Sequence, residues 1–185
     1  MWRMATGRAL VVVWATLGNA AEPGGVGLQS ARSWIQNLSH DVPRVRSTAA
    51  KALAEIGGDE AVEPLAERLT DGDAEVRLQA AYALGRIKKK PEVAIPALTQ
   101  LLRDRDEHVL YSAQWSLGQF AQGLLVAEPA PGAEMRPVGE LLAAAAGTLA
   151  ESKAPEIIQE RVREASERIL SAKSVATSAA ESGSE

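Results

Sequence analysis

Few residues of this 185-residue chain are suited to metal binding or to acid–base catalysis. It has two histidines, His40 and His108, which lie far apart in the sequence, and no cysteine. A zinc site needs three or four Cys, His or carboxylate ligands gathered around one ion. The sequence also lacks a glycine-rich phosphate loop and the serine elbow of hydrolases. We therefore expect no catalytic residues, no metal site and no cofactor.

Three similar nine-residue segments occupy the middle of the chain. They read VRSTAAKAL, VRLQAAYAL and VLYSAQWSL, and they begin at Val45, Val76 and Val109. The spacing between these valines is 31 and then 33 residues. A period of this length is typical of repeat proteins, in which each unit packs only on its neighbours.

Each repeat is predicted to contain two helices, here called the A helix and the B helix. The B helix starts at the valine and carries apolar residues at offsets 0, 4, 7, 8 and 11, which form one stripe of an α-helix. Pro64 and Pro96 mark the preceding A helices, because proline is tolerated in a first helical turn. Neither stripe can be buried by one helix alone, so successive pairs must stack.

The repeat resembles the short HEAT-like repeats first recognised in bilin lyases. The matching residues of the second copy are Asp71, Val76-Arg77, Ala80-Ala81, Ala83-Leu84-Gly85 and Ile87. The resemblance covers about residues 30–122. It implies an all-α fold, a right-handed α-solenoid of stacked helix pairs with about four repeats.

The remaining segments complete the predicted organisation. The segment Val162 to Leu170, VREASERIL, is a degraded fourth B helix, more polar because a terminal repeat has one face in water. The predicted parts are a signal peptide at 1–20, a linker at 21–29, a HEAT-like domain at 30–173 with repeats at about 30–58, 59–90, 91–122 and 135–172, an insertion at 123–134, and a disordered tail at 174–185.

The first twenty residues are typical of an export signal. Arg3 and Arg8 precede the apolar stretch 9–17, and the small residues Gly18 and Ala20 fit a signal-peptidase site. Nine apolar residues are too few for a membrane-spanning helix, which needs about 20. We expect cleavage after Ala20, export to the periplasm or outside the cell, and no stable membrane insertion afterwards. A short buried N-terminal helix is the alternative.

Acidic residues precede each B helix, at Asp41, Asp71 and Asp104. We expect these side chains to cap the helices and to pair with the arginine of a neighbouring repeat's Val-Arg step. The third copy has Leu110 in place of that arginine, so the contact is in doubt there.

The resemblance also raises an enzymatic alternative. Deoxyhypusine hydroxylase, a HEAT-like metalloenzyme, holds two irons with repeated His-Glu pairs, whereas here Asp41 follows His40 and Val109 follows His108. The resemblance to bilin lyases is limited to the repeat. We expect a protein that is not an enzyme, and an accessory or vestigial member of such an enzyme family remains the alternative.

The B-helix positions opposite the apolar stripe are the candidate binding surface. Offset 2 holds Ser47, Leu78 and Tyr111, offset 6 holds Lys51, Tyr82 and Trp115, and offset 9 holds Ala54, Gly85 and Gly118. We predict a protein-binding patch on the concave B-helix face, above a floor of small residues that lets a partner approach the backbone. Its members are Leu78, Tyr82, Tyr111 and Trp115, with Arg86 and Lys51 at the edge.

The partner class follows from charge and composition. The net charge of −4 gives no general electrostatic reason to bind nucleic acid, so a protein or peptide is the expected partner. Two other arrangements remain open. Leu124, Leu125 and Val126 of the insertion could fold over the aromatic residues as an internal lid, or the short solenoid could extend a larger complex through its terminal faces.

Overall fold

The computed structural model describes residues 31–126 and 135–181, and all secondary-structure elements in this part of the chain are helices. The predicted signal peptide and linker lie outside the described residues. Residues 127–134, which make up most of the predicted insertion, lie outside them as well.

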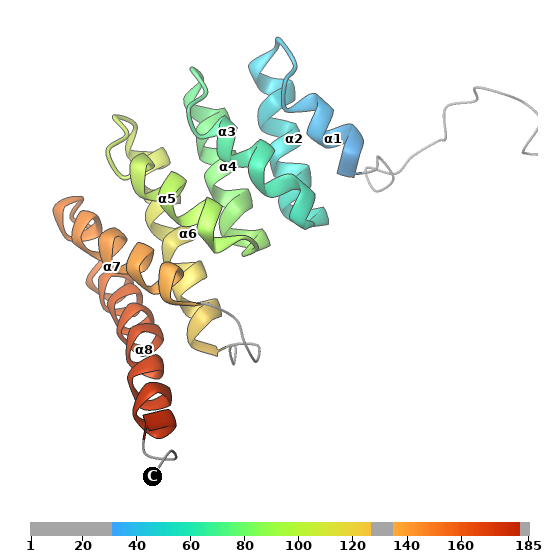
Figure 1. The fold of residues 1–185 in the computed structure, drawn as a ribbon. Coiled ribbons are helices and arrows are strands. Elements are labelled where there is room, and N and C mark those ends of the chain that lie inside the picture. The colour runs from blue at the N-terminus through green and yellow to red at the C-terminus, as the bar shows by residue number, and fades with distance from the viewer. Residues whose placement is uncertain (1–30, 127–134, 182–185) are drawn as a thin grey trace, which may run out of the picture.

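Four helix pairs follow one another along the described chain, as predicted from the repeat (Figure 1). The A helices are α1 (Ala31–Asn37), α3 (Val62–Arg68, after a 3-10 turn at Asp59–Ala61), α5 (Pro91–Leu101) and α7 (Arg136–Glu151). The B helices are α2 (Pro43–Ile56), α4 (Ala74–Ile87), α6 (Glu107–Val126) and α8 (Glu156–Glu181).

The helices form two layers. In one layer α2, α4, α6 and α8 each contact the next, and in the other α3, α5 and α7 do so. Figure 1 shows the pairs succeeding one another from the blue N-terminal end to the red C-terminal end. This arrangement is an α-solenoid, and it confirms the predicted fold class.

The core lies between the two layers and consists mainly of alanine, leucine and valine. Val76, Ala80 and Leu84 of the predicted stripe are fully buried. The equivalent stripe of the first repeat is less covered. Its Ile56 is 49% exposed, whereas Phe120, at the same offset in the third repeat, is 2% exposed. A terminal repeat has a neighbour on one side only, which explains the difference.

Two arginine–aspartate pairs connect successive repeats. Arg46 on α2 donates to both carboxylate oxygens of Asp71, at 2.8 and 2.7 Å, and Arg77 on α4 does the same to Asp104, at 2.7 and 3.0 Å. The Nη1 atom of Arg77 also donates to the carbonyl oxygen of Asp71, at 2.8 Å. Bidentate pairs of this kind fix orientation as well as distance. The predicted pairing between repeats is confirmed.

The capping prediction was wrong in its residues. The side chains that cap α4 and α6 are Asp73, which accepts from the Val76 N–H at 3.2 Å, and Asp106, which accepts from the Val109 N–H at 3.2 Å. Asp71 and Asp104 lie two residues earlier, so they accept instead from the backbone N–H of these capping aspartates, at 3.0 and 2.9 Å.

The first repeat has a histidine at the position of these turn aspartates. His40 precedes Val45 by five residues, as Asp71 precedes Val76. Its Nδ1 atom accepts a hydrogen bond from the Val42 N–H at 3.0 Å, which reproduces the backbone contact of the aspartate. The side chain of Asp41 makes no hydrogen bond or ion pair with the described residues.

The arginine–aspartate series ends after α6. Leu110 replaces the arginine, and Ile157, five residues before Val162, replaces the aspartate and is 64% exposed. Other contacts join α6 to the last pair: Gln114 donates to the carbonyl oxygen of Ser152 at 3.3 Å. The doubt raised by Leu110 was therefore justified, since both members of this pair are absent.

Two predicted boundaries need correction. Helix α6 continues through Gly123 to Val126, into the predicted insertion, because a single helical glycine costs only about 1 kcal/mol and Leu124 and Leu125 pack against the core. Helix α8 continues to Glu181, through most of the tail predicted to be disordered. Residues 174–181 contain four strong helix formers, three alanines and a glutamate, and neither glycine nor proline.

The Arg77–Asp104 pair makes a pH-dependent contribution to stability that can be measured. The hydrogen bond from Arg77 is the main reason that the pKa of Asp104 is lowered. A carboxylate with a lowered pKa stabilises the fold above the ordinary aspartate pKa, and this stabilisation is lost as the pH falls through the folded-state pKa. We expect Asp104→Asn to lower the free energy of unfolding by about 1.5 to 3 kcal/mol at pH 7, and by progressively less below about pH 5.

Urea denaturation at a series of pH values measures this dependence. Asp41→Asn is the matched control, because Asp41 lies in the equivalent turn but makes no hydrogen bond or ion pair with the described residues. Equal destabilisation by Asp104→Asn at pH 7 and at about pH 2.5, which lies below the ordinary aspartate pKa, would show that the charge of Asp104 does not matter.

Candidate protein-binding surface

An open hollow lies between α4 and α6, and we call it the aromatic hollow. Its volume is about 290 Å³, and its lining residues are Leu78, Tyr82, His108, Tyr111, Ser112 and Trp115. Four of the six predicted binding residues, Leu78, Tyr82, Tyr111 and Trp115, are therefore brought together by neighbouring turns of two B helices.

The aromatic side chains of this hollow differ in how much they are available to a partner. The rings of Tyr82 and Trp115 stack with their centroids 5.1 Å apart and their planes at 19°, and both side chains are half-buried. Tyr111 is 61% exposed. The stacked pair thus forms a fixed wall, and Tyr111 is the aromatic residue most open to contact.

The polar group at the base of the aromatic hollow is already satisfied. Ser112 is buried, and its hydroxyl donates to the carbonyl oxygen of Leu78 at 3.1 Å. A ligand group placed against Ser112 therefore does not find a free donor. Recognition in this hollow must come mainly from apolar and aromatic contact.

The predicted floor of small residues has another role. Ala54, Gly85 and Gly118 are buried rather than facing a partner. A Cβ atom on Gly85 would lie 2.5 Å from the Oγ atom of Ser116, whose hydroxyl donates to the carbonyl oxygen of Ala81 at 2.8 Å. Small residues at this offset let one B helix pack closely on the next.

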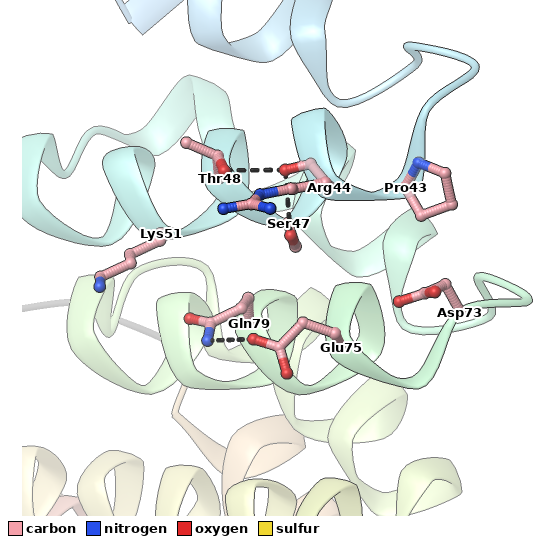
Figure 2. Close-up of a pocket in the computed structure, with 8 residues that line it drawn as sticks. All are labelled: Pro43, Arg44, Ser47, Thr48, Lys51, Asp73, Glu75 and Gln79. Carbon is pink, nitrogen blue, oxygen red and sulfur yellow. Dashed lines mark hydrogen bonds between the residues drawn. The ribbon is translucent and has the colours of Figure 1, made fainter.

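The two cationic residues of the predicted patch lie outside the aromatic hollow. Arg86 forms an ion pair with Glu55 at 3.5 Å across α2 and α4. Lys51 lines a second depression, the polar hollow, of about 410 Å³ between α2 and α4 (Figure 2). The lining residues of the polar hollow are Pro43, Arg44, Ser47, Thr48, Lys51, Asp73, Glu75 and Gln79.

Sequence reasoning missed part of this surface because it placed the open face at offsets 2, 6 and 9. In the structure, offset 9 is packed between helices, whereas offsets −1 and 3 line the hollows. His108 and Ser112 hold these positions on α6, and Glu75 and Gln79 hold them on α4. The repeated small residues at offset 9 were a signal of close helix packing that could have indicated this rotation.

The residues proposed as an internal lid do not cover the aromatic hollow. Leu124 and Leu125 belong to α6 and pack against the core, and Val126 is 79% exposed. Leu124 follows Trp115 by nine residues on the same helix, a separation of about 14 Å along its axis. The hypothesis that these three residues form an internal lid is therefore wrong.

The structure does not bring the two histidines together. His40 bonds to its own turn, whereas His108 borders the aromatic hollow. Among the side chains that the structure describes, no three of His, Cys, Asp or Glu are grouped so that they could hold a metal ion. Within residues 31–126 and 135–181, no helix combines the length and the apolar character that crossing a membrane requires.

Comparison with protein families agrees with the fold. The family model for HEAT repeats matches residues 31–122, which hold the first three helix pairs apart from the end of α6. The protein is a HEAT-like repeat protein. The resemblance stated from the Val-Arg and alanine positions is thereby confirmed.

Individual relatives match only parts of this HEAT-like repeat protein or match it weakly. A HEAT repeat-containing taxis protein of Halobacterium salinarum is 37% identical over 60 residues, which are 32% of this chain and 15% of that protein. Two crystal structures of engineered proteins have TM-scores of 0.44 and 0.41, with 22% and 23% identity. They cover 77% and 76% of this chain, and the matches span 78% and 47% of those chains.

Substitution of Gly85 tests whether the small residues serve helix packing. Because an added methyl group would overlap Ser116, we expect Gly85→Ala to lower the free energy of unfolding by about 1 to 3 kcal/mol. Gly147→Ala on α7 is the matched control. Nothing lies within 4 Å of its added methyl group, so it should stabilise the protein by up to about 1 kcal/mol. A Gly85→Ala protein as stable as the wild type in urea denaturation would refute the packing role.

Proposed function

We propose that this HEAT-like repeat protein is an exported, non-catalytic scaffold that binds a protein or peptide in the aromatic hollow. The observation that carries the proposal is the grouping of Tyr82, Tyr111 and Trp115 around one open depression, with Tyr111 61% exposed. Tyrosine and tryptophan are among the residues that most often dominate binding energy at protein interfaces. Exposed apolar surface of this kind often marks a site of protein interaction.

The scaffold proposal is also supported by the way the surface is built. The hollow is made by side chains on the rigid turns of two packed helices, and its base is fixed by the Ser112 hydrogen bond to α4. A surface that is ordered before binding loses little conformational entropy when a partner docks. Export is proposed from the N-terminal signal pattern alone, which lies outside the described residues.

Affinity capture from the exported fraction of the source cells tests this function. The double variant Tyr111→Ala, Trp115→Ala should lose at least 90% of the captured partner, since truncating one interface hot-spot residue costs about 2 kcal/mol or more. The matched control is Gln100→Ala, Arg103→Ala, which alters exposed residues on the A-helix side. Circular dichroism should show the same helical content for both variants.

Two results would contradict the proposal. Equal capture by the aromatic variant and the wild type would place the binding surface elsewhere on the solenoid. Stoichiometric iron in the purified protein would instead favour an enzyme of hydroxylase ancestry.

A further inference from the structure

Among the described helices, the first pair has no neighbour on the side where each later B helix contacts the one before it. On α6 that side is marked by Ser112 and Ser116, whose hydroxyls donate to backbone carbonyl oxygens of α4 at 3.1 and 2.8 Å. These two residues hold offsets 3 and 7 of their B helix, and the same offsets on α2 hold Thr48 and Ala52. We call the surface of α2 formed by Thr48, Ala52 and Ile56 the open end face.

The open end face is exposed although the equivalent residues of the third repeat are buried. Ile56 is 49% exposed and Thr48 is exposed as well, whereas Phe120 and Ser112, at the same offsets on α6, are 2% and 7% exposed. Thr48, Ala52 and Ile56 follow one another at intervals of four residues, so they share one side of α2. None of the three is charged. The first repeat therefore has the uncharged stacking surface of an internal repeat.

The opposite end of the solenoid has a different character. The side of a B helix that faces the next repeat is marked on α4 by Gly85, which packs against Ser116, and by the carbonyl oxygen of Ala81. The same two offsets on α8 hold Ser171 and Glu167, and both are exposed. A carboxylate buried against an uncharged surface loses its hydration without gaining a partner. Head-to-tail stacking of copies, with Glu167 against the open end face, is therefore disfavoured.

The chain itself offers little to cover the open end face once the predicted signal peptide is removed. The apolar stretch 9–17 leaves with that peptide. Residues 21–30, which then precede α1, read AEPGGVGLQS, and four of these ten residues are glycine or proline. Such a composition disfavours a helix that would take the place of a preceding repeat. In the exported protein the face is thus left for another molecule.

We propose that the open end face binds the same face of a second copy of this chain, so that the exported scaffold is a two-fold dimer. This inference rests on the proposed function, because it starts from the chain cleaved after Ala20. A two-fold axis places identical surfaces against each other. The uncharged centre of one face then meets no charge on the other. The small side chains of Thr48 and Ala52 let the two α2 helices approach closely, as Gly85 lets α6 approach α4.

A dimer built in this way is a bivalent scaffold. Each copy keeps its own aromatic hollow, because Tyr111 and Trp115 lie on α6, two B helices away from the open end face. Two linked sites hold a partner that has two binding segments more tightly than one site does. The second copy therefore adds avidity to the proposed function and leaves the hollow unchanged.

Light scattering during size-exclusion chromatography tests the dimer on the processed chain isolated from the exported fraction. Its mass should rise toward that of two chains as the protein concentration increases. Thr48→Lys, Ile56→Lys brings like charges together across the two-fold axis, so the dissociation constant should rise at least about 10-fold. The matched control is Thr70→Lys, Ile157→Lys, which adds the same charge at exposed residues away from this face and should leave the dimer intact.

The absence of cysteine from the sequence allows a direct test of the two-fold axis. Thr48 and Ala52 lie in the middle of α2, so at least one of the single variants Thr48→Cys and Ala52→Cys should form a disulfide with its own counterpart under mild oxidation. Thr70→Cys, at an exposed position after α3, is the matched control. It should remain a single chain on non-reducing electrophoresis.

The adverse outcomes have separate meanings. A monomer at every concentration, or a dimer that Thr48→Lys, Ile56→Lys leaves unchanged, would overturn this inference. The proposed function still stands if such a protein captures its partner and loses it on Tyr111→Ala, Trp115→Ala. A chain in the exported fraction that retains residues 1–20, or no chain there at all, would contradict both the proposed export and the inference that rests on it.

Discussion

The bidentate contact between an arginine on one B helix and an aspartate before the next sets the register of the solenoid. Arg46 to Asp71 and Arg77 to Asp104 join equivalent positions, so the first three B helices are aligned at their N-terminal turns. Residues at equal offsets on α4 and α6 consequently become neighbours across the stack. The stacking of Tyr82 on Trp115, both at offset 6, depends on this alignment.

The third repeat departs from this pattern in a coordinated way. It loses the arginine at Leu110, and the fourth repeat loses the matching aspartate at Ile157, so neither group is left without its partner. Helix α6 is held on α4 by the Arg77–Asp104 pair and also by the hydroxyls of Ser112 and Ser116, which donate to backbone carbonyl oxygens. The aromatic residues that interrupt the repeat pattern lie on this same helix. The interface between α4 and α6 thus combines close helix packing with the candidate binding surface.

The fold and much of the candidate site could be predicted because the valine spacing and the alanine stripe depend on local helix geometry. The same geometry placed Leu78, Tyr82, Tyr111 and Trp115 in one group. It failed at Gly85, because helical periodicity gives the direction of a residue but not how closely the next helix approaches. It also misplaced the end of α6 at Gly123, where burial of Leu124 and Leu125 outweighs the low helix propensity of glycine.

Binding of a partner in the aromatic hollow requires that this hollow be open to solvent in the whole chain. The emission of Trp115 reports this directly once Trp2, Trp14 and Trp34 are replaced by phenylalanine. With an open hollow, the emission maximum of this half-buried indole should lie at a longer wavelength than that of a fully buried one. The Stern–Volmer constant for acrylamide quenching of the Trp115 emission should then be within a few-fold of the constant for the urea-unfolded chain. A short-wavelength emission that acrylamide barely quenches would show that another part of the chain covers Trp115, and would contradict binding of a partner in the aromatic hollow.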